Sequence, residues 1–257
     1  ARDGAPGYDA EGFGITVGAD KYFNRIDSRF GLAFTYGISD VDSEAGNRAQ
    51  TDIDSFQLAL YGERAIAQDA YLNGYAGLGY NEYDMSRQGP GGTISADYEG
   101  WQIMLGGEIG KRYIRGDYMI TPSFSLDYTY LSLDDYTENG AFATSVDNED
   151  YNQLTAELSV LFARDFQMDQ SMVLRPFVEL GYTGDIVREE QEAQATFVNG
   201  LGTFSTSGVE EAAHGFKGTL GTSLFWSEGA ELNVGYTLHA KDDLMRHTFD
   251  LTARFPF

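Results

Sequence analysis

The chain has 257 residues, of which 42% are hydrophobic and 14% aromatic, with no cysteine and a formal net charge of −23 at pH 7. This acidic excess argues against nucleic acid as a partner, because phosphate contacts require Lys and Arg. The sequence contains no apolar run of roughly 18 residues, which excludes a transmembrane helix. The length suits a single domain over residues 1–257.

The first segment in chain order, Ala1–Gly12, is polar and lacks the apolar run of a signal peptide. A period of two begins at Phe13. It is clearest in Tyr118–Tyr130, where every second residue is apolar or aromatic and those between are mostly polar. Successive side chains of a strand face opposite sides, whereas a helix would scatter them around its circumference. The alternation predicts eleven strands, at residues 13–20, 30–38, 56–61, 72–80, 101–109, 118–130, 154–162, 172–182, 216–226, 232–238 and 249–257.

These strands predict an all-β fold, an antiparallel transmembrane β-barrel. Most segments approach the length of about 9–11 residues that a tilted strand needs to cross a bilayer. A soluble β-sandwich also alternates, but its strands usually have about 5–6 residues. Alternation cancels in a window average, so a mean hydropathy of −0.34 is compatible with a barrel. Aromatic residues crowd the strand ends, as in the girdles of membrane barrels: Tyr22, Phe23, Tyr80, Tyr83, Tyr98, Trp101, Tyr113, Tyr128, Tyr130, Tyr182 and Trp226.

Short and long connections alternate along the chain. The short ones are residues 24–28, 67–69, 115–116, 165–170 and 227–229, and the long ones are 39–51, 81–98, 131–150 and 184–213, with 241–246 intermediate. Membrane barrels have short periplasmic turns and longer external loops, so the short set is expected to face the periplasm. Within the longest loop, Ala195–Phe197 and Gly202–Phe204 suggest a projecting hairpin, with a disordered loop as the equal alternative.

The strand number raises a question of parity. Eleven crossings that end in the periplasm would begin outside the cell, and bacterial single-chain barrels have an even number of strands. We therefore expect a twelve-stranded barrel. Its first strand would be cut off or represented only by an outer end at Ala1–Pro6.

The alternation also assigns side chains to the barrel interior. Both signs of charge occur there, and buried charges must pair or meet water. A hydrated pore is the functional interpretation, and a network that only holds the interior together is the alternative. The expected lumen-facing residues are Asp20, Gln57, Glu63, Asn73, Gln102, Glu108, Arg112, Asp127, Glu157, Arg175, Glu179, Lys217, Glu231, Asn233, Asp250 and Arg254.

Two segments near the start of the chain carry a family resemblance: residues 7–20, Gly-Tyr-Asp-Ala-Glu-Gly-Phe-Gly-Ile-Thr-Val-Gly-Ala-Asp, and the strand Arg29–Gly37. They resemble the opening and the next strand of autotransporter translocator domains of type V secretion in Gram-negative bacteria. The strand around Pro122, the long loop before Phe216 and the terminal Leu251–Phe257 follow in matching order.

The resemblance implies a twelve-stranded outer-membrane barrel with a helix through its lumen, which helps export and anchor an N-terminal passenger. The implied partners are outer-membrane lipid, the passenger segment and the barrel assembly machinery. The C-terminal alternation resembles the signal which that machinery reads; a lipid-facing last strand is the structural alternative, compatible with it. The signal residues would be Phe249, Leu251, Ala253, Phe255 and Phe257.

Other functions remain open at this point. A diffusion porin or an adhesin-like surface barrel is one alternative, and a surface protease is another. Acidic pairs with a histidine can activate water, but solvated acidic loops are the simpler interpretation here. The protease candidates are Asp134, Asp135, Asp242, Asp243 and His247. Neither these nor His214 and His239 match a metal-binding or nucleophile motif, so we expect no enzyme activity, metal or cofactor.

Overall fold

The computed structural model describes residues 7–44, 46, 48–189, 192–200, 202–207, 212–242 and 244–256. These residues form strands and contain no helix long and apolar enough to cross a membrane. The long strands are β1 (Tyr8–Phe23), β2 (Ser28–Ser43), β3 (Gln50–Ala67), β4 (Ala70–Gly89), β5 (Gly92–Lys111), β7 (Tyr118–Leu133), β10 (Tyr151–Arg164), β12 (Met172–Arg188), β15 (His214–Trp226), β16 (Glu231–Lys241) and β17 (Leu244–Arg254). The short ones are β6 (Tyr113–Arg115), β8 (Tyr136–Thr137), β9 (Thr144–Asn148), β11 (Phe166–Gln167), β13 (Glu192–Phe197) and β14 (Thr203–Ser207).

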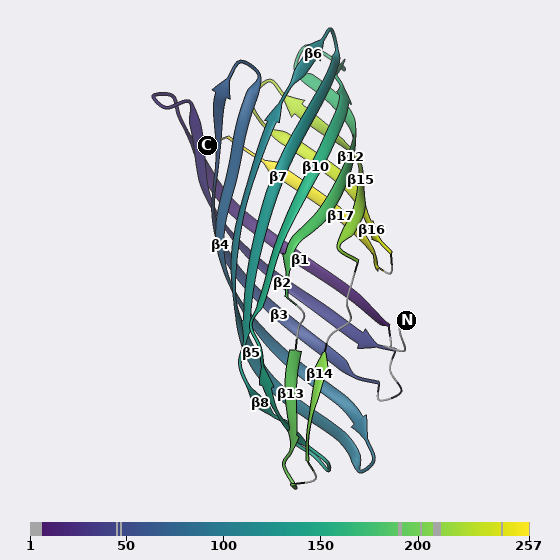
Figure 1. The fold of residues 1–257 in the computed structure, drawn as a ribbon. Helices are drawn as coiled ribbons and strands as arrows, with labels where there is room; N and C mark the ends of the chain where they lie inside the picture. The colour runs from purple at the N-terminus through teal and green to yellow at the C-terminus, as the bar shows by residue number, and fades with distance from the viewer. Residues whose placement is uncertain are drawn as a thin grey trace.

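The long strands form one curled antiparallel sheet (Figure 1). Its order is β1-β2-β3-β4-β5-β7-β10-β12-β15-β16-β17, with β6 beside β7 and β11 beside β12. Each strand therefore pairs with the next long strand in the sequence. The prediction of an antiparallel all-β fold built on eleven long strands is confirmed.

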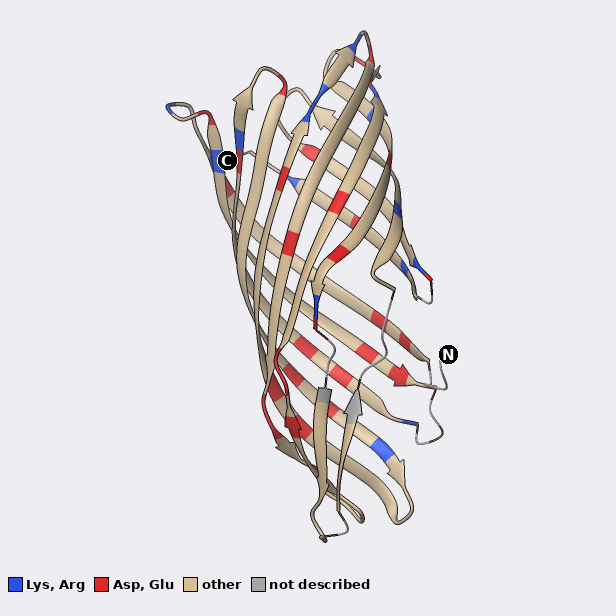
Figure 2. Cartoon of the chain, viewed as in Figure 1, with Lys and Arg blue, Asp and Glu red and all other residues tan. Residues whose placement is uncertain are grey.

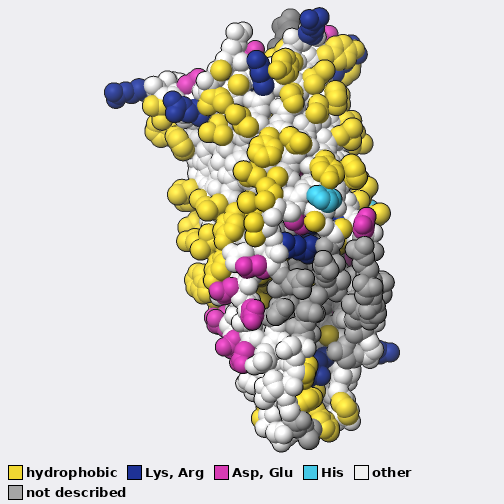
Figure 3. All heavy atoms as spheres, in the orientation of Figure 1, with side chains coloured by type: hydrophobic (Ala, Val, Ile, Leu, Met, Phe, Trp, Pro, Cys, Tyr) yellow, Lys and Arg dark blue, Asp and Glu magenta, His cyan; other side chains and the backbone are white. Residues whose placement is uncertain are grey.

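The outer wall of the sheet is apolar, as the alternation predicts. In β2, exposed and partly buried residues alternate almost without a break. Large hydrophobic side chains such as Phe13, Leu60, Leu158 and Phe216 are each more than 60% exposed. A soluble protein would bury them, so an apolar wall of this extent indicates contact with lipid. Figure 3 shows hydrophobic side chains over much of the wall and an acidic group nearer one end.

Several strands are longer than the sequence predicts. β4 continues to Gly89 and β5 begins at Gly92, so the predicted loop 81–98 is wrong: it is a hairpin closed at its tip by Pro90 and Gly91. Pairing extends this far because the alternation continues through polar residues, and Asp84 lies opposite Asp97. Polar alternation marks a strand that continues beyond the lipid, and a prediction based on apolar residues does not detect such a strand.

The long connections join into a second sheet, which we call the platform. Its order is β14-β13-β9-β8, and Ser95 at the end of the β4–β5 hairpin bridges to Asn139 beside it. The predicted hairpin in residues 184–213 is thus confirmed as β13 and β14. Most of the buried apolar residues of the described chain lie in or directly beside this sheet: Ala143, Val146 and Ala195, with Ile94 and Ala96 on the adjoining end of β5.

The β4–β5 hairpin beside the platform carries two aromatic residues that the sequence predicts for the membrane girdles. Tyr83 and Tyr98 stack at 4.8 Å between ring centroids, and Tyr98 stacks on Tyr136 of β8 at 4.4 Å. The girdle assignment of Tyr83 and Tyr98 is therefore wrong, because the hairpin that carries them extends beyond the apolar wall. Their rings connect the barrel wall to the platform.

The curled sheet has two free edges. In the described residues no pairing joins β1 to β17, and ten antiparallel steps separate them, so the two run in the same direction. The expected twelfth strand stays a prediction, and Ala1–Pro6 lie outside the described residues.

Candidate functional site

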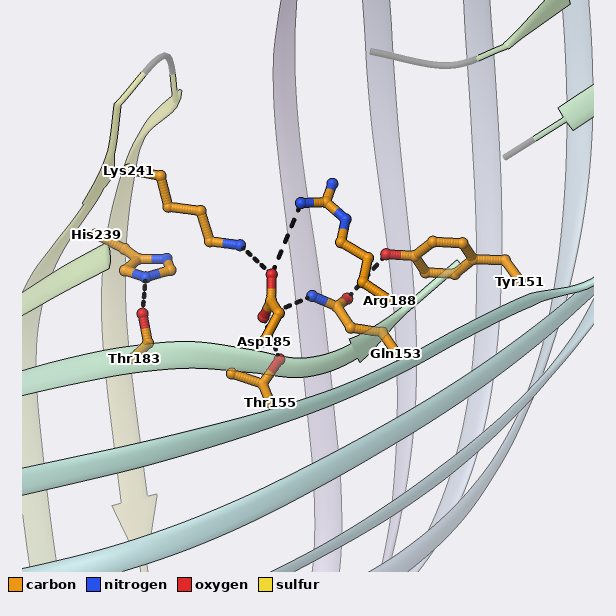
Figure 4. A network of polar contacts seen from close by, with 8 residues as sticks. All are labelled: Tyr151, Gln153, Thr155, Thr183, Asp185, Arg188, His239 and Lys241. Carbon is orange, nitrogen blue, oxygen red and sulfur yellow. Dashed lines mark hydrogen bonds and ion pairs between the residues drawn. The ribbon is translucent and has the colours of Figure 1, made fainter. Parts of the chain in front are cut away.

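The concave face of the sheet carries a connected set of polar side chains. Figure 4 shows its densest part, where side chains from β10, β12 and β16 meet. Asp185 is the centre of this cluster. Its side chain is 1% exposed and forms an ion pair with Lys241, whose Nζ donates to Asp185 Oδ2 at 2.9 Å. Thr155 Oγ1 and Gln153 Nε2 donate to Asp185 Oδ1 at 2.8 and 3.1 Å.

A β-bulge shapes the cluster. The register between β10 and β12 shifts where Leu154 faces Val187 and Thr155 faces Asp185, which leaves Ile186 as an extra residue. A bulge places two consecutive residues on one side of the strand and reverses the alternation beyond it. The reversal brings Arg188 to the face of Asp185, and Arg188 Nη1 lies 3.7 Å from Asp185 Oδ2.

Gly215 makes room for the contacts between β16 and β12. It lies opposite Thr183 of β12 and Lys241 of β16. A Cβ atom on Gly215 would come within 2.9 Å of both His239 Nε2 and Lys241 Cγ. Because Gly215 lacks a side chain, His239 reaches Thr183 Oγ1 at 3.0 Å and Lys241 reaches Asp185.

A second ion cluster joins β10, β12 and β15. Lys217 Nζ lies 2.5 Å from Glu157 Oε1 and 3.3 Å from Glu179 Oε1. The side chain of Glu157 again passes close to a glycine, Gly181, whose absent Cβ would meet Glu157 Oε1 at 2.9 Å. All three charged residues were predicted to face the lumen, and the structure brings them together.

A third cluster lies at the short-turn end and touches both edges of the sheet. Asp20 of β1 binds Arg254 of β17 and Arg29 of β2, the latter at 3.4 Å. Tyr61 Oη of β3 donates to Asp20 at 3.3 Å, passing over Gly31. Residues 234 positions apart in the sequence thus meet across the unpaired edges.

The remaining predicted residues form smaller contacts. Two are ion pairs: Glu63 lies 3.8 Å from Arg112, and Arg175 binds Asp165 at 2.5 Å. Three are hydrogen bonds: Asn73 donates to Glu108 at 3.4 Å, Tyr75 donates to Asp127 at 2.9 Å, and Asn233 donates to Glu231 at 2.8 Å. Asp250 lies beside Gly235, and Gln57 and Gln102 flank Gly79. Opposite charges are therefore paired along much of this face, and whether the face lines a pore stays a prediction.

The residues of the densest cluster were not predicted from the sequence. The predicted strand ended at Tyr182, although Thr183 and Asp185 continue the polar alternation and could have been identified from it. Arg188 could not, because only the bulge turns it inward. His239 and Lys241 lie at the end of β16, beyond its apolar residues. Only the alternation of side chains along the strand indicates that they face the lumen.

Two of the residues considered for peptide hydrolysis have other partners. Asp135 Oδ1 accepts from the backbone of Asn148 at 2.8 Å, and His247 Nδ1 lies 2.8 Å from Tyr236 Oη. Asp243 lies outside the described residues. Within the described ranges, no group of three His, Asp or Glu residues could hold a metal ion.

The predicted assembly signal lies on the free edge strand. Phe249, Leu251 and Phe255 are each at least 70% exposed, and Phe257 lies outside the described residues. Its recognition by the assembly machinery stays a prediction.

Comparison with known protein families shows to which family of barrel proteins the chain belongs. The model of the autotransporter beta-domain family matches residues 1–237. The chain is an autotransporter β-domain. Such domains are outer-membrane proteins of Gram-negative bacteria, and export of an attached passenger is their general role.

Solved structures support the same fold for this autotransporter β-domain. The translocator domain of NalP from Neisseria meningitidis matches with a TM-score of 0.77 and 17% identity, over 96% of this chain and 81% of that one. The β-domain of the Bordetella autotransporter BrkA gives 0.75 and 17%, over 97% and 92%. The transport unit of AIDA-I from Escherichia coli gives 0.67 and 10%, over 100% and 86%.

Proposed function

We propose that this β-domain exports an N-terminally attached passenger through its lumen and anchors it at the cell surface. The observation that carries the proposal is the contrast between the two faces of the sheet. The outer wall is apolar, whereas the concave face is lined with paired charges such as Asp185–Lys241 and Glu157–Lys217. Paired charges and hydroxyls offer hydrogen bonds to a passing polypeptide backbone without presenting an unpaired charge to it.

The free edges support a complete barrel with one more strand. Because β1 and β17 run in the same direction, a single strand antiparallel to both would close the sheet. A closed barrel leaves no backbone group unpaired in lipid. We propose that this strand precedes Tyr8. By pairing with both β1 and β17, it would complete the barrel wall beside Asp20 and Arg254.

The exposed edge of β17 supports a role in assembly. Its outward side chains Phe249 and Leu251, with Phe255 directly after the strand, alternate along an edge whose backbone is unpaired on one side. An edge strand can add to a template sheet while alternate side chains fill pockets. We propose that the barrel assembly machinery engages β17 in this way.

The export function is tested with an epitope placed in the passenger and labelled on intact cells. Thr219 faces the lumen, where its hydroxyl lies 3.0 Å from that of Thr237, and Leu220 faces the opposite side. We expect Thr219→Trp to lower surface labelling, because the indole narrows the lumen. Leu220→Trp is the matched control and should label as the parent does.

Folding of both variants is verified by the mobility shift of unheated barrels on denaturing gels. Equal labelling of the two folded variants would argue against passage through this lumen. A parent protein that conducts ions in planar bilayers and displays no passenger would instead support a diffusion porin.

A further inference from the structure

The lysines and arginines of the described chain fall into two groups. One group is held in ion pairs: Arg29, Arg87, Arg112, Arg175, Arg188, Lys217, Lys241 and Arg254. The other group forms no ion pair within the described residues: Lys21, Arg25, Arg48, Arg64, Lys111, Arg115, Arg164 and Arg246. Except for Arg87, the paired cations lie on the concave face or at its ends. The ion pairs of that face therefore do not explain where the unpaired cations lie.

Most of the unpaired cations gather at one end of the barrel. Lys21, Arg64, Lys111 and Arg164 stand near or at the ends of β1, β3, β5 and β10, and Arg115 ends β6. All five are at the short-turn end and all are exposed. We call them the basic rim.

Register shows that the basic rim faces outward. Lys21 lies opposite Phe30, and Arg64 lies opposite Leu72, both on the apolar wall. Residues directly opposite each other in a sheet project from the same face. Tyr118, which is 57% exposed on the outer wall, is paired with Arg115 on one side and Arg164 on the other.

Aromatic rings hold part of this rim against the wall. The Arg164 guanidinium lies 4.8 Å from the Tyr118 ring centroid and 4.6 Å from that of Phe166. Lys111 Nζ lies 5.3 Å from the Tyr113 ring. A cation placed over an aromatic ring at the edge of an apolar belt lies at the depth of lipid headgroups.

The opposite end of the same wall carries the other sign. Glu11, Asp40, Asp52, Asp84 and Asp97 stand directly opposite one another across β1 to β5. Figure 2 shows acidic residues in these strands toward the platform and basic ones at the short-turn end. The outer wall is thus charged oppositely at its two ends, and an anionic partner is attracted to only one of them.

We propose that the basic rim binds the phosphate groups of anionic phospholipids in the periplasmic leaflet of the outer membrane. The headgroups supply the negative charge that Lys21, Arg64, Lys111, Arg115 and Arg164 lack within the described protein. Juxtamembrane Lys and Arg side chains attract anionic lipid in this way, and salt weakens the attraction. The proposal rests on the outer-membrane placement of the domain and not on passenger export.

Tryptophan quenching tests the proposal at each end separately. The chain has two tryptophans. Trp101 is 58% exposed and lies two residues after the acidic Glu99. The Trp226→Phe variant keeps Trp101 as the single fluorescent reporter of the acidic end. Phe166→Trp in a Trp101→Phe, Trp226→Phe background places a single reporter beside Arg164. Each protein is reconstituted in phosphatidylcholine vesicles that contain a minor fraction of brominated phosphatidylglycerol or of brominated phosphatidylcholine.

We expect the reporter at position 166 to be quenched about threefold more by the brominated phosphatidylglycerol than by the brominated phosphatidylcholine at low salt, and nearly equally in concentrated salt. Trp101 should show no preference for the anionic lipid. Equal quenching of the position 166 reporter by both lipids at low salt would overturn the proposal.

Charge variants then assign the preference to the basic rim. Arg115→Gln with Arg164→Gln should abolish the preference, and Arg115→Lys with Arg164→Lys should retain it. Arg48→Gln with Arg246→Gln removes two unpaired arginines elsewhere and is the matched control. An undiminished preference in the first variant, or an equal loss in the control, would show that the rim does not select the lipid.

Discussion

Lys241 of β16 and Asp185 of β12 form a 2.9 Å ion pair although β15 lies between their strands. Their side chains are 6% and 1% exposed, so the pair is shielded from water. The contact is made across Gly215, the one residue of β15 that stands between Thr183 and Lys241 in register. Three strands of the wall are therefore joined by side chains as well as by backbone hydrogen bonds.

Filling the space at Gly215 should break this connection. A Cβ there meets His239 Nε2 and Lys241 Cγ at 2.9 Å and the backbone oxygen of Ala240 at 3.0 Å. We expect Gly215→Val to destabilise the folded barrel by about 1–3 kcal/mol, measured by urea unfolding in lipid vesicles. Gly218→Val on the same strand is the control, because a Cβ at Gly218 meets no atom within 4 Å. Equal stability of the two variants would contradict the role assigned to Gly215.

Removing one charge of the pair should cost more than removing both. Lys241→Met leaves Asp185 buried with Thr155, Gln153 and the more distant Arg188 as partners. Breaking a buried pair on one side costs about 3–5 kcal/mol, so we expect a loss near the lower end of that range. Adding Asp185→Asn should restore part of it, and unfolding of the single and double variants measures the coupling. Additive losses would show that the two residues act independently.

Much of this fold follows from alternation alone. Eleven long strands, their antiparallel order and the outward placement of residues such as Leu158 and Phe216 need only a period of two. A few apolar residues in a polar loop suggested the hairpin β13–β14, with a disordered loop as the equal alternative, and the structure shows the hairpin. What alternation misses is a strand that continues beyond the lipid, because the β4–β5 hairpin has no apolar face left to mark it.

The polar clusters were predicted less completely for a related reason. Parity assigns Glu157, Glu179 and Lys217 to one face, but it does not say that they meet, which depends on a diagonal contact beside Gly181. Arg188 obeys the opposite parity because of the bulge at Ile186. A single extra residue reverses every later assignment, and nothing in the local composition announces it.

A charge on the outer wall should be costly where the wall meets lipid. Leu58 of β3 lies between the acidic Asp54 and the basic Arg64 on the same outward face, and it is 49% exposed. We expect Leu58→Arg to destabilise the barrel by about 2–4 kcal/mol in vesicles, because an arginine at the bilayer centre loses its hydration. The neighbouring Gln57→Arg points to the concave face and should cost clearly less. Equal costs in the two variants would mean that this part of β3 is not in contact with lipid.

The platform depends on an acid group outside the membrane. Glu138 of the connection between β8 and β9 is 5% exposed. Arg87 donates to both of its carboxylate oxygens at 2.6 Å, and the backbone and hydroxyl of Thr144 donate at 2.8 and 2.7 Å. Burial opposes the charge, but the hydrogen bonds from Arg87 and Thr144 outweigh it and hold the pKa of Glu138 below its ordinary value of 4.5.

Acid should therefore loosen the platform before it unfolds the barrel. A lowered pKa means that the contribution of Glu138 to stability is complete above pH 4.5 and is lost as the pH falls through the lower pKa of the folded state. The Thr144 amide, which donates to Glu138, should lose protection from hydrogen exchange in that window, after correction for the intrinsic rate. The Arg112 amide, bonded to the Asp69 carbonyl at the other end, is the control. In Glu138→Gln, protection of Thr144 should be low at neutral pH and change little with acid; strong protection at neutral pH would show that another contact holds the platform.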